Sequence, residues 1–401
     1  MRRLLNLDGR VLAAAAVIVF FAVLLSFRAV NGTTPWAHVG VAPGAVSFLD
    51  LRSVTSSWEC EHKGVEAFPD NPCDPFHRPA NYPRLWTRFG AVGLGPGDTV
   101  PLGVAIAVVF FLAALAVTGP LTFGEGAVYG AALLAPASML GVERGNVDLL
   151  MFALVAVGVL LIRRSPWAGA VPIVLAGVLK LFPATALAAL VRKRNRWPAA
   201  VGSVVVLGAY GIATFHDIRT LRHAIPRQVI DSYGAGVVAD VLADSPSGVR
   251  EVRIAVIVVG LLLALGLRLL RGGANGNDGG LRLDVFWAGA GIYLASYVFG
   301  SNFDYRLAFL LLCVPQLCEW ARNGGSPAPW PAAALASLVA TLWLSSAQPP
   351  LPFGLQTWYL KLSFPPDEVL NWLLFAWLAA ALLVAPQFRH RTATKGVRSA
   401  P

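Results

Sequence analysis

Apolar segments of about 16 to 20 residues recur along most of the chain, and they constrain its fold more than any other feature. A helix of that length crosses a hydrocarbon layer of about 30 Å. Inside lipid the backbone amides must be paired within the chain, so these segments have to be helical. We therefore expect an all-α polytopic bundle with about ten transmembrane spans, at residues 11–30, 99–118, 126–141, 147–162, 198–215, 252–270, 285–300, 305–320, 331–344 and 369–384.

The composition supports a membrane protein and argues against a nucleic-acid-binding one. Of the 401 residues, 56% are hydrophobic and 13% are charged, whereas a soluble domain has about 25% charged residues. The formal net charge is +10, but the basic residues gather in short loops beside the apolar segments, as they do on the cytoplasmic side of membrane proteins. We expect a lipid bilayer as the partner and no nucleic acid.

The apolar stretch at 167–191 interrupts the expected alternation of cytoplasmic and extracytoplasmic loops. Basic residues at 163–164 precede it and basic residues at 192–196 follow it, so both flanks resemble cytoplasmic loops. A single crossing here would invert the charge bias of all later loops. We expect a re-entrant hairpin with Lys180 near its turn, and a simple span is the alternative. Irregular backbone at membrane depth needs cover from protein or water, so the turn should line a cavity.

With that hairpin, both termini lie in the cytoplasm, and the expected location is the plasma membrane. Residues 31–98 then form a long first extracytoplasmic loop, whose prolines and aromatic residues predict an ordered structure lying against the membrane. Two of the four cysteines, Cys60 and Cys73, lie in this loop. They are candidates for a disulfide, which the extracytoplasmic side permits, although spacing alone does not establish the bond. We treat residues 1–401 as one membrane-embedded domain.

Two groups of polar residues lie near predicted extracytoplasmic ends of spans. Asp50 belongs to the first loop, and Arg144 and Asn146 lie in a charged turn between two apolar segments. Charges so close to hydrocarbon are costly and are usually paired or functional. Arg144 is therefore either a ligand-binding group or half of a structural ion pair with Glu143 or Asp148.

Lys180 is the only charged residue between positions 171 and 190. Its long stem could reach an interface, or its ammonium could neutralise a phosphate together with Arg144. Asp304 and Arg306 follow another extracytoplasmic turn, at the start of a helix whose dipole favours an anion, and an ordinary ion pair is the alternative there. The chain contains no nucleotide-binding glycine fingerprint and no zinc-type spacing of His and Cys. We expect neither a metal nor another cofactor.

The order of these elements along the first half of the chain resembles a known family. The elements are, in order, Asp50, Tyr82-Pro83-Arg84, Arg144-Gly145-Asn146 and Lys180-Leu181-Phe182-Pro183. This order is similar to that of glycosyltransferase family 87, bacterial membrane mannosyltransferases of the GT-C fold that use polyprenyl-phosphate mannose as donor. Two features depart from the family pattern, because Arg84 replaces the second proline of a Tyr-Pro-Pro element and a cysteine-bearing insert precedes it.

The resemblance implies a membrane hexosyltransferase. It would transfer a sugar, most simply mannose, from a polyprenyl-phosphate donor to an envelope glycolipid or glycan on the extracytoplasmic face. Carried onto this sequence, it makes Asp50 the catalytic base and Arg144 and Lys180 ligands of the donor phosphate, and Arg306 is a further candidate for that role. The candidate substrate-binding residues are Tyr82, Arg84, Asn146 and Asp304.

The chemistry of the reaction supports these assignments independently of the resemblance. A carboxylate has to remove the proton of the acceptor hydroxyl, and fixed cations have to stabilise the charge that develops on the departing phosphate. A single in-line displacement predicts inversion at the anomeric carbon. A transporter or flippase of a lipid-linked sugar is the alternative, and it predicts ionisable residues that face one another near mid-membrane.

Overall fold

A computed structural model describes residues 8–224, 231–243, 245–270, 280–299, 302–345 and 353–383. The basic segments at 1–7 and 384–401, the glycine-rich linker at 271–279 and the turn residue Ser301 lie outside the described residues. The orientation inferred from the charges of the two termini therefore stays a prediction.

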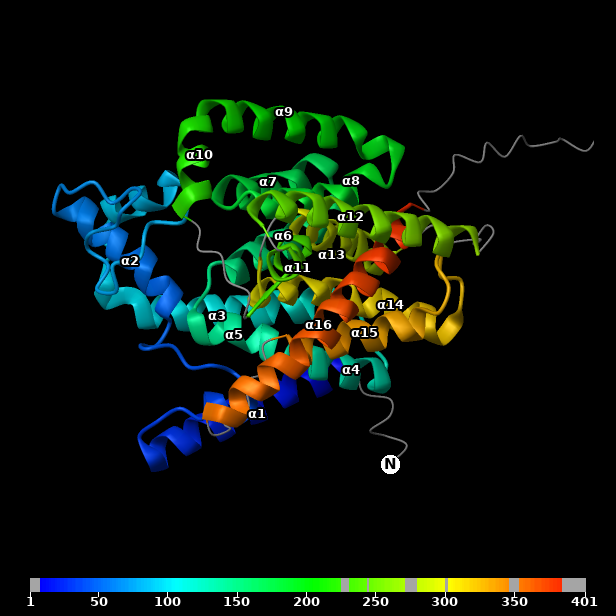
Figure 1. Ribbon diagram of the computed structural model, residues 1–401, viewed down its shortest axis with the longest axis horizontal. Coiled ribbons are helices and arrows are strands. Elements are labelled where there is room, and N and C mark those ends of the chain that lie inside the picture. The colour runs from blue at the N-terminus through cyan, green and yellow to red at the C-terminus, as the bar shows by residue number, and fades with distance from the viewer. Residues whose placement is uncertain are drawn as a thin grey trace, which may run out of the picture.

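The described residues are mostly helical (Figure 1), in agreement with an all-α membrane protein. The helices are α1 (Gly9–Asn31), α2 (Leu49–His62), α3 (Thr99–Val117), α4 (Phe123–Leu133), α5 (Pro136–Arg144), α6 (Asp148–Ile162), α7 (Pro166–Leu179), α8 (Ala188–Val191), α9 (Trp197–Ala213), α10 (Phe215–Ala224), α11 (Ala235–Leu242), α12 (Pro246–Leu269), α13 (Leu281–Val298), α14 (Val314–Asn323), α15 (Pro331–Leu344) and α16 (Phe353–Leu382).

Short 3₁₀ helices and one small sheet complete the described structure. The 3₁₀ helices are Trp36–Val39, Arg84–Val92, Pro96–Asp98, Phe182–Leu187, Arg194–Arg196 and Asp304–Leu312. The strands β1 (Ser232–Tyr233) and β2 (Asn302–Phe303) pair antiparallel. This pairing ties the segment after α10 to the segment that carries Arg306.

Four described helical segments are long and apolar enough to cross a membrane, namely Gly9–Asn31, Pro96–Val117, Arg194–Ala213 and Ser247–Leu269. Helices α4 and α5 would make a fifth span, which bends by 51° where Pro136 begins a new helix. Other predicted spans form shorter helices, such as α6 and α15. The structure therefore supports a multi-pass membrane protein, and the count of about ten spans stays a prediction.

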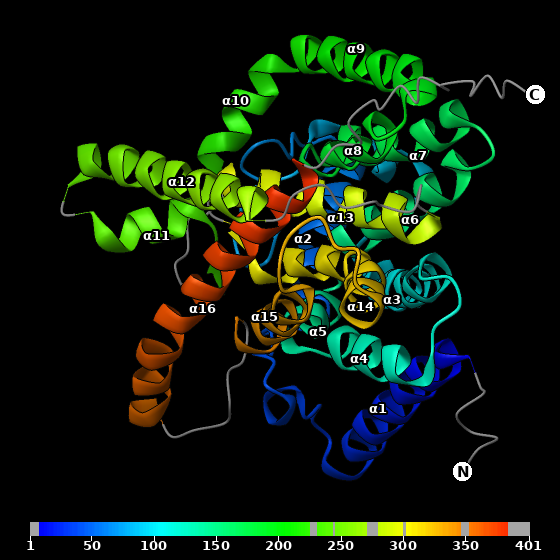
Figure 2. The same cartoon turned by 90° about the vertical axis from the view of Figure 1, so that its right-hand side faces the viewer.

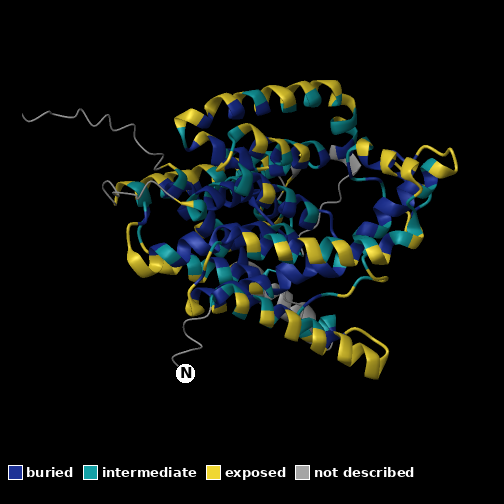
Figure 3. Ribbon diagram, turned by 180° about the vertical axis from the view of Figure 1, so that it is seen from behind, coloured by how far each residue is buried: buried dark blue, intermediate teal, exposed yellow. Residues whose placement is uncertain are grey.

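The helices at the edges of the bundle expose apolar faces. Helices α1 and α9 lie at opposite edges (Figure 2), and their outward surfaces are largely exposed (Figure 3). Val204, Val205 and Ile212 of α9 are 61%, 65% and 81% exposed. Apolar side chains on the outside of a helix are expected where lipid is the solvent.

Helices α6 and α7 form a closely packed antiparallel pair. A Cβ on Gly158 of α6 would lie 2.8 Å from the carbonyl oxygen of Gly169 of α7, and a Cβ on Gly169 would lie 2.6 Å from the carbonyl oxygen of Gly158. Only glycine permits this approach of two backbones. Because α6 begins at Asp148 and α7 ends just before Lys180, the pairing returns Lys180 to the end of the bundle where α6 starts.

The chain folds back immediately after α7. A Cβ on Gly177 would lie 2.9 Å from the Cβ of Ala184, whereas seven residues of continuous helix span about 10 Å. The segment from Phe182 to Val191 therefore returns alongside α7 with Lys180 at the turn. This arrangement agrees with a hairpin at 167–191, and its depth in a membrane stays a prediction.

Helix α9 runs in the same direction as α7. A Cβ on Gly202 would meet the ring of Trp167 at 2.7 Å, and further along a Cβ on Gly177 would meet Leu207 at 3.1 Å. The basic segments at 163–164 and 192–196 therefore lie at the same end of the bundle, as the hairpin requires.

Two residues of the second basic segment are buried in an ion cluster. Arg192 Nη2 and Arg196 Nη1 lie 2.6 Å and 2.7 Å from Asp284 Oδ1, and the exposed fractions of these three side chains are 5%, 7% and 2%. These arginines thus fasten the base of the hairpin to α13, although the sequence had suggested a solvated loop.

Two adjacent carboxyl groups, Asp367 and Glu368, are buried just before the last predicted span. Their exposed fractions are 5% and 6%, and Asp367 accepts a hydrogen bond of 2.6 Å from the Ser345 hydroxyl. Burial raises the pKa of Asp367 from 3.8 to about 7, against the effect of that hydrogen bond. Burial, and then the charge of Asp367, raise the pKa of Glu368 well above 4.5.

Raised pKa values in the folded state predict that the protein loses stability as the pH rises from about 4 towards 7, because the unfolded chain releases these protons first. We expect Asp367→Asn and Glu368→Gln to raise the melting temperature in detergent at pH 8 and to leave it unchanged at pH 4. Thermal melts of the wild type and both variants between these values would check this. Equal pH dependence in all three proteins would contradict it.

Candidate active site

Asp50 lies in the first turn of α2 and contacts a residue far away in the sequence. Its Oδ2 atom accepts a hydrogen bond of 2.6 Å from the side-chain amide of Asn146. The Oδ1 atom of Asn146 accepts in turn from the backbone N–H of Asp148 at 2.9 Å. The first loop and the turn between α5 and α6 therefore meet at Asp50.

The turn between α5 and α6 holds the first loop through backbone contacts. Gly145 ends α5 with φ +59°, in the left-handed region that glycine favours, and the Phe48 side chain lies against it. The N–H of Phe48 donates to the carbonyl of Glu143 at 3.2 Å. The N–H of Gly44 donates to the Glu143 carboxylate at 2.8 Å. These bonds fix the position of the start of α2, and hence the position of Asp50 in its first turn.

The environment of Asp50 favours the protonated form of its carboxyl group. Burial raises the pKa, and it outweighs the opposing effects of the Asn146 hydrogen bond and of the charges of Arg144, Arg78 and Lys180. The residue is nevertheless half-buried, not fully enclosed. A partly accessible carboxylate with a raised pKa is a suitable proton acceptor near neutral pH.

Two cations from distant segments share the carboxylate of Asp148. Lys180 Nζ lies 2.5 Å from its Oδ1 atom, and Arg306 Nε lies 3.3 Å from its Oδ2 atom. The Asp148 side chain is 1% exposed. Arg306 also donates to the side-chain oxygen of Asn302. The cluster of Asp148, Lys180 and Arg306 therefore has one positive charge in excess.

Aromatic rings support both cations. Lys180 Nζ lies 4.9 Å from the centroid of the Tyr82 ring, and the guanidinium of Arg306 lies 4.8 Å from that of Phe182. Such cation–π contacts are stronger where water is excluded. The rings thereby hold the cations in place through their faces, while N–H groups of both cations bond the Asp148 carboxylate.

A cavity of about 1250 Å³ opens beside this cluster. Its walls come from the first loop, the turn after α7, α9, α10, α12 and the segment at 302–306, and Tyr82, Lys180, Tyr305 and Arg306 line it. Asp50 lies beside this wall, close enough for its charge to act on the hydroxyls of Tyr82 and Tyr305. A cavity of this size accommodates a sugar phosphate.

Four of the predicted site residues do not line the cavity, namely Asp50, Asn146, Arg144 and Asp304. Asp50 and its partner Asn146 lie beside the wall, whereas Arg144 and Asp304 have other contacts. Arg144 pairs with Glu143 at 3.3 Å and donates to the carbonyl of Ala42 at 3.4 Å, so the structural alternative considered for it is the one observed. Its charge still acts on Asp50. Asp304 is fully buried, and its N–H donates to the carbonyl of Asp231.

Arg84 lines the cavity at its edge and joins two elements. Its guanidinium lies 3.2 Å from Glu66 of the first loop, 3.6 Å from Asp217 of α10 and 4.9 Å from the centroid of the Phe68 ring. A proline at this position would make none of these contacts. Arg84 therefore links the first loop to α10.

Asp148 and Tyr305 are the residues that the sequence did not single out for the site. Asp148 was considered only as an alternative partner of Arg144. A signal was present, because it is the first residue of an apolar helix and the first turn of a helix favours an acid. Its actual partners come from segments that no local pattern connects to it.

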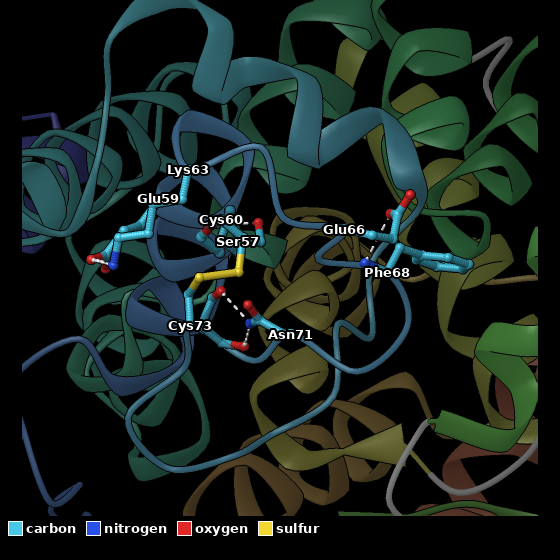
Figure 4. The surroundings of a disulfide bond; sticks show 10 residues. Ser57, Glu59, Cys60, Lys63, Glu66, Phe68, Asn71 and Cys73 are labelled. Atoms are coloured by element: carbon cyan, nitrogen blue, oxygen red, sulfur yellow. Dashed lines mark hydrogen bonds and ion pairs between the residues drawn. A yellow bond between two sulfur atoms is a disulfide. The ribbon is translucent and has the colours of Figure 1, made fainter.

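A disulfide joins Cys60 of α2 to Cys73 (Figure 4). It lies among ordered polar contacts, including the hydrogen bond of 3.0 Å from the Asn71 amide to the carbonyl of Ser53. The bond closes part of the first loop onto the helix that carries Asp50.

Replacing both Cys60 and Cys73 by Ser should lower the free energy of unfolding by about 3 kcal/mol. The two cysteines are 13 positions apart, and closing a loop of that length restricts the unfolded chain. The melting temperature in detergent would measure the loss. Cys318→Ser, which alters a free cysteine, is the control. An unchanged melting temperature in the double variant would contradict the prediction.

The described part of the chain contains no group of three or more His, Cys, Asp or Glu residues that could hold a metal ion. The expectation that the reaction needs no metal stays a prediction.

Comparison with known proteins gives a family match over part of the chain. No curated protein and no solved structure gave a match. Residues 89–222, about a third of the chain, match the model of glycosyltransferase family 87. The matched segment contains Asn146, Asp148 and Lys180 and excludes Asp50 and Arg306. The similarity over this segment supports a family 87 glycosyltransferase.

Proposed function

We propose that the protein transfers a sugar, most simply mannose, from a polyprenyl-phosphate donor to an envelope glycolipid or glycan on the extracytoplasmic face. Asp50 acts as the base, and Lys180 and Arg306 bind the donor phosphate. One observation carries the proposal: two cations that share one carboxylate line a cavity beside a half-buried carboxyl group.

The charge of the cluster suits this donor. A sugar linked to a polyprenyl phosphate is a phosphodiester with one negative charge, which the excess charge of the cluster balances. As the sugar departs, the phosphate gains a second negative charge. Preorganised N–H donors stabilise such developing charge more effectively in a site that excludes water. Lys180 and Arg306 provide these donors at the cavity wall.

Asp50 is better suited than Asp148 to act as the base. Asp148 is 1% exposed and its carboxylate is bonded by two cations, so it is poorly accessible to an acceptor hydroxyl. Asp50 bonds an amide instead, and burial raises its pKa. If Asp50 activates the acceptor hydroxyl for one in-line displacement, the configuration of the anomeric carbon inverts.

The arrangement of basic residues supports an extracytoplasmic site. The segments at 163–164 and 192–196 lie at the opposite end of α6 and α7 from Asp148 and Lys180. Short basic segments are retained in the cytoplasm. The cavity end would then face outwards, where the Cys60–Cys73 disulfide is stable.

The decisive assay incubates the purified protein in liposomes with radiolabelled polyprenyl-phosphate mannose and an extract of envelope glycolipids. We expect labelled glycolipid of inverted configuration, and none from a nucleotide-linked mannose. Retained configuration would exclude the single displacement. Movement of the donor between leaflets without transfer would favour the flippase.

A further inference from the structure

Trp86 contacts the backbone that carries Lys180. Its ring is 6% exposed, and its indole N–H donates to the carbonyl of Leu179 at 2.9 Å. Leu179 is the last residue of α7, and the final carbonyls of a helix have no partner within it. A side chain of the first loop therefore satisfies the end of the helix that immediately precedes Lys180.

Lys180 depends on contacts from outside its own helix. It leaves α7 with an extended backbone, φ −157° and ψ 118°. The segment that supplies Trp86 also supplies Tyr82, whose ring lies under the Lys180 ammonium. The rings of Tyr82 and Trp86 are 5.9 Å apart. One short segment of the first loop thus contacts both the backbone before Lys180 and its charged group.

Trp86 is itself held in place by α2. The indole N–H of Trp58 donates to the carbonyl of Trp86 at 2.6 Å, and Trp58 lies two residues before Cys60, which forms the disulfide. A continuous set of contacts therefore runs from α2, which carries the disulfide, through Trp58 and Trp86 to the end of α7 at the turn of the hairpin.

We infer that Trp86 is a positioning residue for the donor phosphate, and that it acts through the Leu179 carbonyl to fix the ammonium of Lys180 at the cavity wall. This inference rests on the proposed function, in which Lys180 binds that phosphate. It assigns the first loop a role in donor binding in addition to carrying the base.

The test is a double-mutant cycle on the dissociation constant of polyprenyl monophosphate, measured in detergent by calorimetry. The proteins are the wild type, Trp86→Phe, Lys180→Met and the double variant. We expect Trp86→Phe to weaken binding by about 3- to 10-fold, the value of one net hydrogen bond. In the Lys180→Met variant, we expect Trp86→Phe to leave the dissociation constant unchanged.

Trp197→Phe is the matched control. The indole N–H of Trp197 donates to the carbonyl of Val191, the last residue of α8, at 2.8 Å. Its donor and acceptor groups are the same as in the Trp86 bond, but it is exposed and lies at the base of the hairpin. We expect wild-type affinity from this variant. If Trp86→Phe does not fold, benzothienylalanine at position 86 removes the N–H and preserves the size of the ring.

Two results would overturn the inference and leave the proposed function standing. The first is wild-type affinity in the protein without the Trp86 N–H. The second is an equal loss of affinity with and without Lys180, which would indicate a general structural role. Failure of the wild-type protein to bind polyprenyl monophosphate would instead reject the proposed donor, and the inference with it.

Discussion

Replacing Asp50 by Asn should lower kcat by about 10² to 10⁴, the contribution of a general base. The amide is nearly the same size as the carboxyl group, and its oxygen can still accept the hydrogen bond from Asn146. It cannot take a proton from the acceptor hydroxyl. Because the charge that burial disfavours is also removed, we expect no loss of stability. Initial rates of sugar transfer and melting temperatures, measured on the same preparations, would check both expectations.

Asp70→Asn is the matched control for Asp50→Asn. Asp70 is an exposed aspartate of the same loop, so its replacement changes the net charge equally and should leave kcat unchanged. If Asp50→Asn transferred sugar at the wild-type rate, Asp50 would not be the base. If neither variant formed glycolipid but both still moved the lipid-linked sugar between leaflets, the flippase would be favoured.

The second large effect concerns Lys180. Replacement by Met, which has a similar length and no charge, should lower kcat/KM by about 10² to 10³, the loss measured when one stabilising donor is removed from a reacting oxyanion. Asp148 and Arg306 would remain as a neutral pair, so the excess positive charge would disappear. We expect a raised KM for the polyprenyl-phosphate donor and an unchanged KM for the acceptor. Steady-state kinetics with each substrate varied in turn would measure this.

Lys63→Met serves as the control for Lys180→Met, because Lys63 is exposed in the first loop and its ammonium pairs with Glu59, one helical turn earlier. Its kcat/KM should equal that of the wild type. Equal donor KM values for Lys180→Met and the wild type would remove Lys180 from the donor site.

The convergence of Asp50, Asn146 and Lys180 could be expected from the order of motifs along the chain. Glu143 was one of the partners considered for Arg144, but the contact of Arg144 with the first loop and the partners of Asp148 could not be expected. Gly145 reverses the chain between these two residues, so Arg144 contacts the first loop while Asp148 faces the end of α7. That geometry depends on packing between segments far apart in the sequence.

The helical character of the fold was predictable because each apolar segment has to pair its backbone amides in lipid. The lengths of the helices were not. Pro136 bends one predicted span, and the segment Asp304–Leu312 forms a 3₁₀ helix where a regular span was expected. Hydropathy averages over such interruptions, which depend on proline and on tertiary contacts.

The shared carboxylate of Asp148 has a consequence for turnover. An incoming phosphate must compete with a resident anion for the same N–H donors, so its affinity is lower than two free cations would give. In the proposed reaction, Lys180 and Arg306 would regain a counter-ion already in place when the spent lipid carrier departs. This exchange of one anion for another would limit inhibition by the product, and the donor would bind less tightly as a result.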